Sequence, residues 1–495
     1  MALLKALGVA LIALITFTTA DVSQCCRNLE NKLGAQSFYG HNDTDFAVQN
    51  TRWSTNARLN PTCIIKPHHA EHVAQAVTVL VEGECEFAIK AGGHTPWSGA
   101  NSIDHGVVID LSFLNRTALS PDRSFARLGA GGTWGHAYNQ LNGSGVAIPG
   151  GRVKTVGVGG LVLGGGYSWL TPKVGWVANN VLNYEIVLAS GEVRNVNASS
   201  DSDLFMALKG GGNNFGIVTS FDIATFKHDQ KIWGGFFALP ATDTNTTFQS
   251  FQQFVEKVAE GDDDASLVAL EFVHTKTSSQ DQIINWVSSI DAVDETSALW
   301  AYDPLFSGNK LANSTGWTTF ADFPNSIPPV ARVTFATVTV QPMAIDSVPV
   351  LEKIHQITRD VYETLSHVPD LTWDVQYEPL PRAYDDRGLV EGGNIMGLNY
   401  TTKSLVIVFL MPLWEDARFD NEVNSAVQKW LTLVQTYIAV HDVGYPFEYL
   451  NYAAPFQNPL ASYGAHNLQF LKEVSKKYDP DQIFQRLVPG GFKLN

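Results

Sequence analysis

Charged residues are scarce in this sequence, and basic ones are scarcer than acidic ones. Only 17% of the residues are charged, the formal net charge is -16, and no run of lysine or arginine offsets it. The average field of such a chain repels phosphate backbones and anionic lipid surfaces. We therefore expect no nucleic-acid partner.

Beyond its first residues the chain has no apolar segment long enough to span a membrane. The opening stretch has Lys5 near its start, an apolar run over 6–17, and small residues at Thr18 and Ala20. This layout is typical of a secretory signal peptide over 1–20. The apolar run falls short of the roughly 20 residues of a membrane anchor. We expect a secreted protein that has no membrane contact after cleavage.

Cysteine is rare as well, and all four cysteines lie in the first fifth of the chain. An oxidising compartment would pair them. Because neighbours Cys25 and Cys26 do not favour a bond with each other, two pairings with Cys63 and Cys85 remain open. Sequons that agree with export, and that predict a glycoprotein, occur at Asn42, Asn115, Asn142, Asn197, Asn245, Asn313 and Asn399.

Several common catalytic signatures are missing. No strand leads into G-x-G-x-x-G followed by a ribose-binding acid, and G-x-x-x-x-G-K-[ST] is absent. No serine elbow supports Ser-His-Asp catalysis. His68, His69 and His72 cluster at a helix start, but they have no acidic or thiol partners at ligand spacing, so we expect no metal site.

The patterns that are present predict an α+β chain in two main parts. In the glycine-rich first half, short apolar runs predict strands at 63–65, 87–90 and 107–111, with helices after Pro67 and over 134–141. A hairpin is expected about Ser190-Gly191. After Phe226 the glycine clusters stop and longer helices and strands follow. We predict an N-terminal segment over 21–56, then domains over 57–230 and 231–446, and a C-terminal segment over 447–495.

Three glycine-rich loops carry the chemistry of the first half, at 90–101, 155–166 and 209–219. Without a Cβ, glycine lets backbone N–H groups converge on a phosphate and lets the chain pass close to a flat ring. One such loop alone would be a tight turn in a β-rich scaffold. Three at these spacings, with His94 inside the first, are specific.

Together these loops resemble the PCMH-type FAD-binding domain of the vanillyl-alcohol oxidase superfamily, and more closely the fungal members of its berberine-bridge-enzyme-like branch. The resemblance runs from about Thr51 to Phe226 and resumes at Asn451-Tyr452 and over 463–484. It implies a two-part FAD-binding domain, to which the C-terminal segment returns, and an α+β substrate domain with an antiparallel sheet. The cofactor-binding positions that it implies are Ala91, Gly92, Gly93, His94, Thr95, Ser98, Gly99, Thr155, Gly157, Gly159, Gly160, Gly165, Asn179, Gly216, Ile217, Val218 and Asn451.

By this resemblance His94 bonds covalently to the flavin, as a neutral ring nitrogen is nucleophilic at ordinary pH. Members of the branch often have a second tether, a cysteine just before the second glycine loop. Here Val153 occupies that place. We therefore predict FAD attached through His94 only. Asn179 replaces an aspartate of the family, which weakens the hydrogen-bonding role carried over to that position.

Oxidation by a flavin also needs a base for the second proton. In plant relatives the base lies on a strand that resembles 404–414, where this chain has Phe409 and no charge. Tyr449 and Tyr452 look like the paired tyrosines of sugar-oxidising relatives, and Glu378 could be their acidic partner. For Glu378, an alternative is a solvated carboxylate at a strand end.

The reaction expected is oxidation of a small organic molecule, with electrons passed to oxygen. The closing 488–492 resembles fungal members of the group and points to secondary-metabolite biosynthesis. Three alternatives stay open: a carbohydrate or oligosaccharide oxidase, against which Val153 counts; a non-redox isomerase or cyclase; and an inactive secreted glycoprotein.

Overall fold

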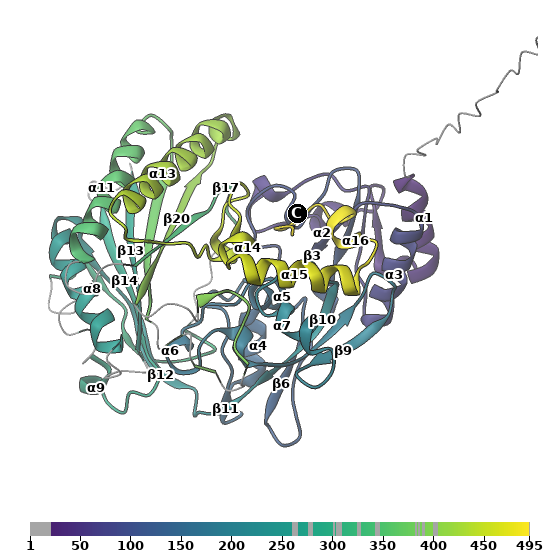
Figure 1. The fold of residues 1–495 in the computed structure, drawn as a ribbon, viewed down its shortest axis with the longest axis horizontal. Helices are drawn as coiled ribbons and strands as arrows, with labels where there is room; N and C mark the ends of the chain where they lie inside the picture. The colour runs from purple at the N-terminus through teal and green to yellow at the C-terminus, as the bar shows by residue number, and fades with distance from the viewer. Residues whose placement is uncertain are drawn as a thin grey trace, which may run out of the picture.

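The chain folds around three extended β-sheets. The computed structural model describes residues 21–259, 266–275, 281–299, 302, 309–323, 328–341, 347–381, 384, 387–388, 392–398 and 404–494. Within these residues the sheets have four, five and ten strands (Figure 1). The predicted signal peptide over 1–20 and the sequon at Asn399 lie outside the described residues.

The four-stranded sheet contains the strands predicted for the start of the first half. β2, β4 and β3 are parallel, and their apolar side chains are buried, as is usual for parallel strands. β1 adds an antiparallel edge. The order in the sheet is β1 (Phe38–Gly40), β2 (Cys63–Ile65), β4 (Val107–Asp110) and β3 (Phe87–Lys90).

Helix α3 (Ala70–Glu82) connects β2 to β3. Val73, Val77 and Leu80 are fully buried, as their helical spacing predicted. The helix begins after the predicted Pro67, because His69 still has an extended backbone and caps the first turn.

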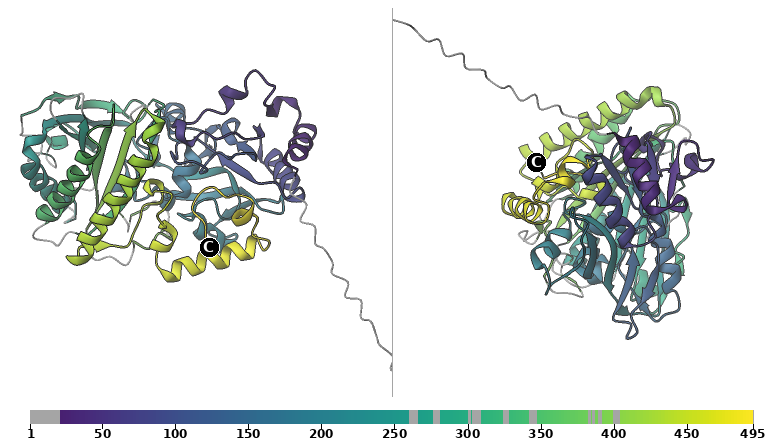
Figure 2. Two further views of the ribbon diagram at one scale, coloured as in Figure 1. Left: turned by 90° about the horizontal axis from the view of Figure 1, so that it is seen from above. Right: turned by 90° about the vertical axis from the view of Figure 1, so that its right-hand side faces the viewer.

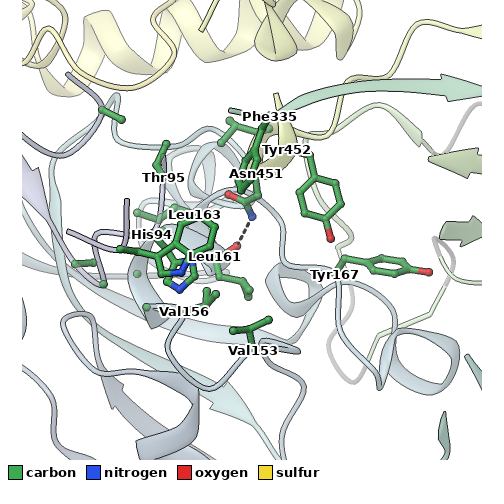
Figure 3. A pocket seen from close by; sticks show the side chains of 18 of the residues that line it. His94, Thr95, Val153, Val156, Leu161, Leu163, Tyr167, Phe335, Asn451 and Tyr452 are labelled. Carbon is green, nitrogen blue, oxygen red and sulfur yellow. Dashed lines mark hydrogen bonds between the residues drawn. The ribbon is translucent and has the colours of Figure 1, made fainter. Parts of the chain in front are cut away.

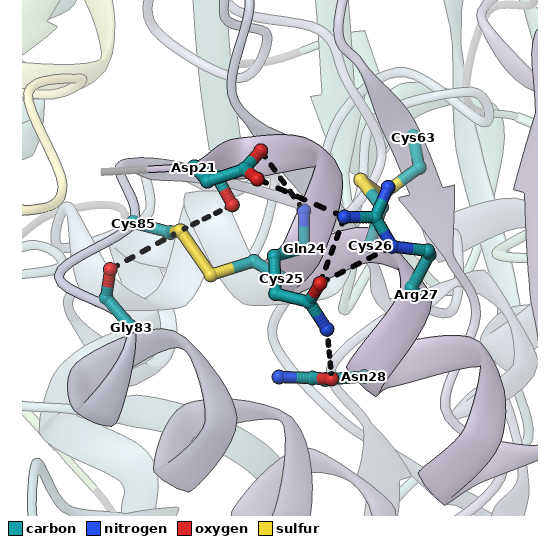
Figure 4. Close-up of a disulfide and its surroundings, with 9 residues drawn as sticks. All are labelled: Asp21, Gln24, Cys25, Cys26, Arg27, Asn28, Cys63, Gly83 and Cys85. Atoms are coloured by element: carbon teal, nitrogen blue, oxygen red, sulfur yellow. Dashed lines mark hydrogen bonds and ion pairs between the residues drawn. A yellow bond between two sulfur atoms is a disulfide. The ribbon is translucent and has the colours of Figure 1, made fainter. Parts of the chain in front are cut away.

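Two disulfides fasten helix α1 (Val22–Leu33) to this part of the chain (Figure 4). Cys25 bonds Cys85 and Cys26 bonds Cys63, and this decides between the two pairings that the sequence left open. Adjacent residues of a helix point in directions about 100° apart. One thiol therefore reaches the start of β2 and the other the turn before β3.

The five-stranded sheet is antiparallel throughout. Its outer pair, β8 and β9, forms the hairpin predicted about Ser190-Gly191, where Gly191 has φ +80°. Helix α4 (Trp134–Leu141) has the predicted bounds and begins at Thr133, whose side chain accepts from the His136 amide. The order is β5 (Thr117–Leu119), β6 (Phe125–Gly129), β10 (Ile217–Ala224), β8 (Val181–Val187) and β9 (Val193–Asn197).

The ten-stranded sheet is built from the second half of the chain and is antiparallel, as the resemblance implied. Helices α8 (Thr244–Ala259), α11 (Ser347–Thr364) and α13 (Asp420–Val440) cover one of its faces (Figures 1 and 2). Its central strands are β12 (Lys231–Pro240), β14 (Gln282–Ser289), β13 (Ser266–Thr275), β19 (Thr372–Leu380), β20 (Leu405–Trp414) and β18 (Ala336–Val340). None of the helices in the described ranges is long and apolar enough to cross a membrane.

Strand β19 shows how the two faces of this sheet differ. Trp373, Val375 and Tyr377 are buried toward the helices, and the Tyr377 ring lies 5.0 Å from that of Phe248 on α8. Side chains alternate along a strand. The residues that alternate with these three along the strand, among them Glu378, therefore face the other way, toward the glycine-rich part of the molecule.

The C-terminal segment crosses back from the large sheet to the first half (Figure 1). Helix α15 (Ala465–Tyr478) packs against α7 (Ser202–Leu208), and the Tyr478 hydroxyl donates to Asp203 at 2.7 Å. The amide of Phe87 in β3 donates to the Leu487 carbonyl. The α+β fold class is confirmed, whereas the domain boundaries stay a prediction.

The disulfide pairing makes a sharp prediction. In Cys26→Ser/Cys63→Ser, thiol titration of the denatured protein should find no free thiol, because Cys25 and Cys85 remain bonded. The matched variant Cys25→Ser/Cys63→Ser should expose two thiols. Losing one cross-link should lower the unfolding free energy by about 2–4 kcal/mol, measured by guanidinium denaturation. The reverse thiol counts would disprove the pairing.

Candidate active site

A cavity of about 570 Å³ lies between the glycine-rich loops and the ten-stranded sheet. The loops form one wall and strands β13, β14, β19 and β20 form the opposite one. The C-terminal segment contributes Tyr449 to Ala453, and the Asn451 side chain donates to the Leu161 carbonyl at 3.2 Å (Figure 3). Residues from all parts of the sequence thus meet around one space.

The first two glycine loops touch backbone to backbone. A Cβ added to Gly92 would overlap the backbone of Gly157, and one added to Gly157 would overlap Gly92. Both positions therefore require glycine, and Gly93 beside them has φ +68°. This contact brings His94 and the second loop onto the same wall.

The third loop approaches the cavity at Gly216. A Cβ there would lie 2.6 Å from the carbonyl oxygen of Val187, so the loop can pack closely on β8 only with glycine. Most of the cofactor-binding and catalytic positions predicted from the sequence line the cavity. They are Ala91, Gly92, Gly93, His94, Thr95, Gly157, Gly159, Gly160, Gly216, Ile217, Val218, Asn451, Tyr449 and Tyr452.

Some predicted positions do not line it. Asn179 is buried behind the wall, where its amide donates to the Arg387 carbonyl and its oxygen accepts from Asn394. Gly165 packs against Met396. These two residues therefore lie away from the cavity, because protein fills the space around them, and their contact with the cofactor stays a prediction.

Ser98, Gly99 and Thr155 also lie outside the lining. Gly99 packs against Gly490, because a Cβ added to Gly490 would overlap the carbonyl oxygen of Gly99. Ser98 precedes Gly99 in the same loop. Thr155 acts on the cavity indirectly, since its hydroxyl lies 2.9 Å from Nε2 of His94.

The His94 ring is held in one orientation. It stacks on Trp53 with ring centroids 4.3 Å apart, and its Nε2 atom forms a hydrogen bond with the Thr155 hydroxyl. Burial lowers the pKa of His94 to about 4. The imidazole is therefore neutral at ordinary pH, which is the nucleophilic form.

Val153 lines the same cavity (Figure 3). Its side chain can form no bond to a flavin. No cysteine in the described residues is free, because all four are in disulfides. Among these residues nothing replaces the second tether.

Glu378 is fully buried, so the alternative of a solvated strand-end carboxylate is wrong. It forms an ion pair with Arg152, and the Tyr452 hydroxyl lies 3.1 and 3.3 Å from its two oxygens. Arg152 also donates to the Tyr452 hydroxyl. We call these three side chains the Arg152 cluster.

Sequence reasoning missed Arg152. The signal was a lone arginine directly before Val153, in a run of glycine and apolar residues. Its guanidinium also lies over the rings of Tyr167 and Trp169, at 5.1 and 5.2 Å from their centroids. The faces of these two rings and the Glu378 carboxylate thus replace the water that the buried guanidinium loses.

The cluster keeps Tyr452 protonated. Burial raises the pKa of Tyr452 well above its ordinary value, although Arg152 opposes the rise. Burial lowers the pKa of Arg152, but Glu378 outweighs this and the net pKa is raised. Tyr452 can therefore donate to Glu378 while Arg152 carries the positive charge. The Tyr452 ring stacks on the Phe409 ring, with centroids 4.0 Å apart. Phe409 is the residue at the position where the family resemblance places the base of plant relatives.

Tyr449 is a weaker catalytic candidate. Its hydroxyl accepts from the Tyr167 amide at 2.8 Å and from Asn451 at 3.0 Å. Burial raises its pKa to about 12. Because its oxygen is already held by two donors, Tyr449 mainly positions the C-terminal segment.

The charges beneath the first glycine loop suit an anionic cofactor such as FAD. Lys90 pairs with buried Asp110 at 2.9 Å, and Arg52 and Lys66 surround the same carboxylate. Nη2 of Arg52 is buried without a hydrogen-bond partner among the residues that the structure describes, and Arg52 lies against Gly93. Three cations to one carboxylate leave positive charge for a diphosphate at this turn. The residues present therefore fit FAD.

The expectation of no metal site rested on His68, His69 and His72. His69 lies 2.9 Å from exposed Glu71. Among the described residues, no three His, Cys, Asp or Glu side chains lie close enough together to hold a metal ion.

Comparison with known proteins agrees with this geometry. Residues 61–197 match the family model described as an FAD binding domain. The FAD-dependent monooxygenase sdcF of Emericella nidulans is 31% identical over 96% of this chain and 99% of its own. The bifunctional solanapyrone synthase of Alternaria solani is 32% identical over 96% of this chain and 90% of its own.

Among solved structures, the glucooligosaccharide oxidase of Acremonium strictum has the same fold, with a TM-score of 0.73 and 18% identity over 92% of this chain and 97% of its own. The fold is thus the one that the resemblance of the glycine-rich loops implied. The chain belongs to the family of FAD-dependent fungal enzymes that includes sdcF, and it is an FAD-linked oxidoreductase.

Proposed function

We propose that the protein is a secreted oxidase that removes two electrons from a small organic molecule of fungal secondary metabolism and passes them to oxygen, which leaves as hydrogen peroxide. The observation that carries this proposal is the position of the Arg152 cluster. It reaches, through Tyr452, the same cavity as His94 and the glycine loops. A proton acceptor and a flavin site thus share one space.

FAD, when bound, supplies the two-electron acceptor of the reaction. The protein must then take the proton of the oxidised group, for example of an alcohol. Tyr452 can accept this proton at its phenol oxygen while it passes its own proton to Glu378, which lies at hydrogen-bond distance. Arg152 stays charged and holds both partners in place.

We further propose that His94 is the sole covalent anchor of FAD. The glucooligosaccharide oxidase is described as holding FAD through both an 8α-N1-histidyl and a 6-S-cysteinyl bond. In this chain Thr155 engages Nε2 of His94, which leaves Nδ1 for such a bond, and Val153 cannot supply the other. The absence of a second tether argues against sugar oxidation.

Secretion is supported by the surface chemistry of the chain. Two disulfides agree with an oxidising compartment. The described sequons are at the surface: Asn42, Asn115, Asn142, Asn245 and Asn313 are exposed and Asn197 is partly exposed.

The anchor is tested by acid precipitation. Flavin should stay with the wild-type pellet and leave with the supernatant in His94→Ala, because no second bond holds it. His72→Ala, a histidine on α3, is the control and should behave as wild type. Free flavin from the wild-type protein would exclude the tether, and retention in His94→Ala would place it elsewhere.

The base is tested by flavin reduction without oxygen. On an alcohol that bleaches the wild-type flavin in stopped flow, Tyr452→Phe should slow reduction by about 10²–10⁴-fold, the usual contribution of a positioned proton acceptor. Tyr449→Phe loses a hydroxyl in the same segment and should slow it far less. Equal rates in the two variants would remove Tyr452 from the mechanism.

The fate of the consumed oxygen distinguishes the proposed oxidase from a monooxygenase, which is the activity that the name of sdcF states. An oxidase should release one hydrogen peroxide for each oxygen molecule consumed, measured with an oxygen electrode and a peroxidase-coupled dye. Oxygen uptake without peroxide, with an oxygen atom found in the product by mass spectrometry, would favour a monooxygenase.

A further inference from the structure

A row of polar side chains leads away from the Arg152 cluster along the wall formed by the large sheet. Gln376 lies two residues before Glu378 on β19 and therefore on the same face. Across the sheet Gln376 pairs with Glu271 on β13. Glu271 is thus displaced from Glu378 by about 7 Å along the strand and about 5 Å across it.

Glu271 lines the cavity and has a fixed orientation. Trp286 donates its indole N–H to Oε2 at 2.7 Å, and Gln376 donates to Oε1 at 3.3 Å. Both donors are neutral, so they orient the carboxylate without cancelling its charge. Neighbouring Ala269 and Ile284 line the cavity beside it.

A second carboxyl group lies behind Glu271. Asp374 is 3% exposed, its Oδ2 atom accepts from Gln376 at 3.1 Å, and its Oδ1 atom has no hydrogen-bond donor among the described residues. Burial, and then the nearby charge of Glu271, raise the pKa of Asp374 well above its ordinary value. Asp374 therefore holds a proton and can donate it to the Glu271 carboxylate.

The Glu271 carboxylate has no counter-ion in the described part of the chain. Neither Glu271 nor Asp374 takes part in an ion pair there, in contrast to Glu378, which has Arg152. A charge withdrawn from water is costly unless a charged or strongly polar partner meets it. Closing the cavity over a substrate would withdraw Glu271 from water, so the substrate itself has to supply the charged or strongly polar partner.

The surrounding side chains suit an organic cation. Trp286, which donates to Glu271, and Phe323 line the cavity, and aromatic faces attract ammonium groups. A neutral apolar ligand would cover the aromatic rings but would leave the carboxylate without a partner.

We propose that Glu271 is a specificity-determining residue that binds a protonated amine of the substrate, at the end away from Tyr452. The proposal rests on the proposed function, because it assigns the substrate class of the same cavity. It places the reacting carbon beside Tyr452 and the ammonium group between Glu271 and the aromatic rings.

The test compares two probes of nearly equal shape, benzylamine, which is protonated at neutral pH, and benzyl alcohol. Dissociation constants are measured on the yellow holoprotein by anaerobic calorimetry. Benzylamine should bind the wild type about tenfold more tightly or better, the usual gain of a hydrogen bond to a charged group. In Glu271→Gln, which keeps the shape and the bond from Trp286, the two probes should bind within about twofold of each other.

Asp374→Asn is the matched control in the same carboxyl pair. It keeps a hydrogen-bond donor toward Glu271 and should preserve the preference for the amine. Loss of the preference in this variant, no preference in the wild type, or a preference that survives in Glu271→Gln would each overturn the proposal. A protein that stays colourless with added FAD would instead refute the proposed function, so the two failures are distinct.

Discussion

The buried ion pair between Arg152 and Glu378 is the interaction on which the site depends. It joins the approach to the second glycine loop to strand β19, and Tyr452 adds the C-terminal segment to the same contact. Loss of one partner would leave the other charged in a dry environment, at a cost of several kcal/mol. The two halves of the chain must therefore meet in one register, and that register places the tyrosine at the cavity.

In the ten-stranded sheet, the alternation of side chains along each strand connects this contact to the rest of the cavity. Side chains alternate along β19, so apolar residues pack on helices while Glu378 and Gln376 face the loops. On the next strand Phe409 presents a ring instead of an acid and stacks on Tyr452. The sheet thus supplies Glu378, which contacts Tyr452, and Glu271, which lines the cavity farther along the same wall.

Much of the fold could be predicted from local patterns. Short apolar runs located β2, β3 and β4, and helical spacing located α3 and α4. Packing places two of the predicted cofactor positions away from the cavity. Asn179 and Gly165 belong to loops that match the family, yet protein side chains fill the space around them. A motif shows which loop a residue belongs to, but not which way the residue points.

The sequence by itself determined the family and the cofactor, because these follow from the identity of residues at spaced positions: glycines without a Cβ in three loops, with His94 inside the first. Only the tertiary structure decided which cysteines pair, that Glu378 is buried, and that Arg152 faces it. These features join residues up to 226 positions apart. Local patterns carry no information on such distances, which are set when the sheet packs against the loops.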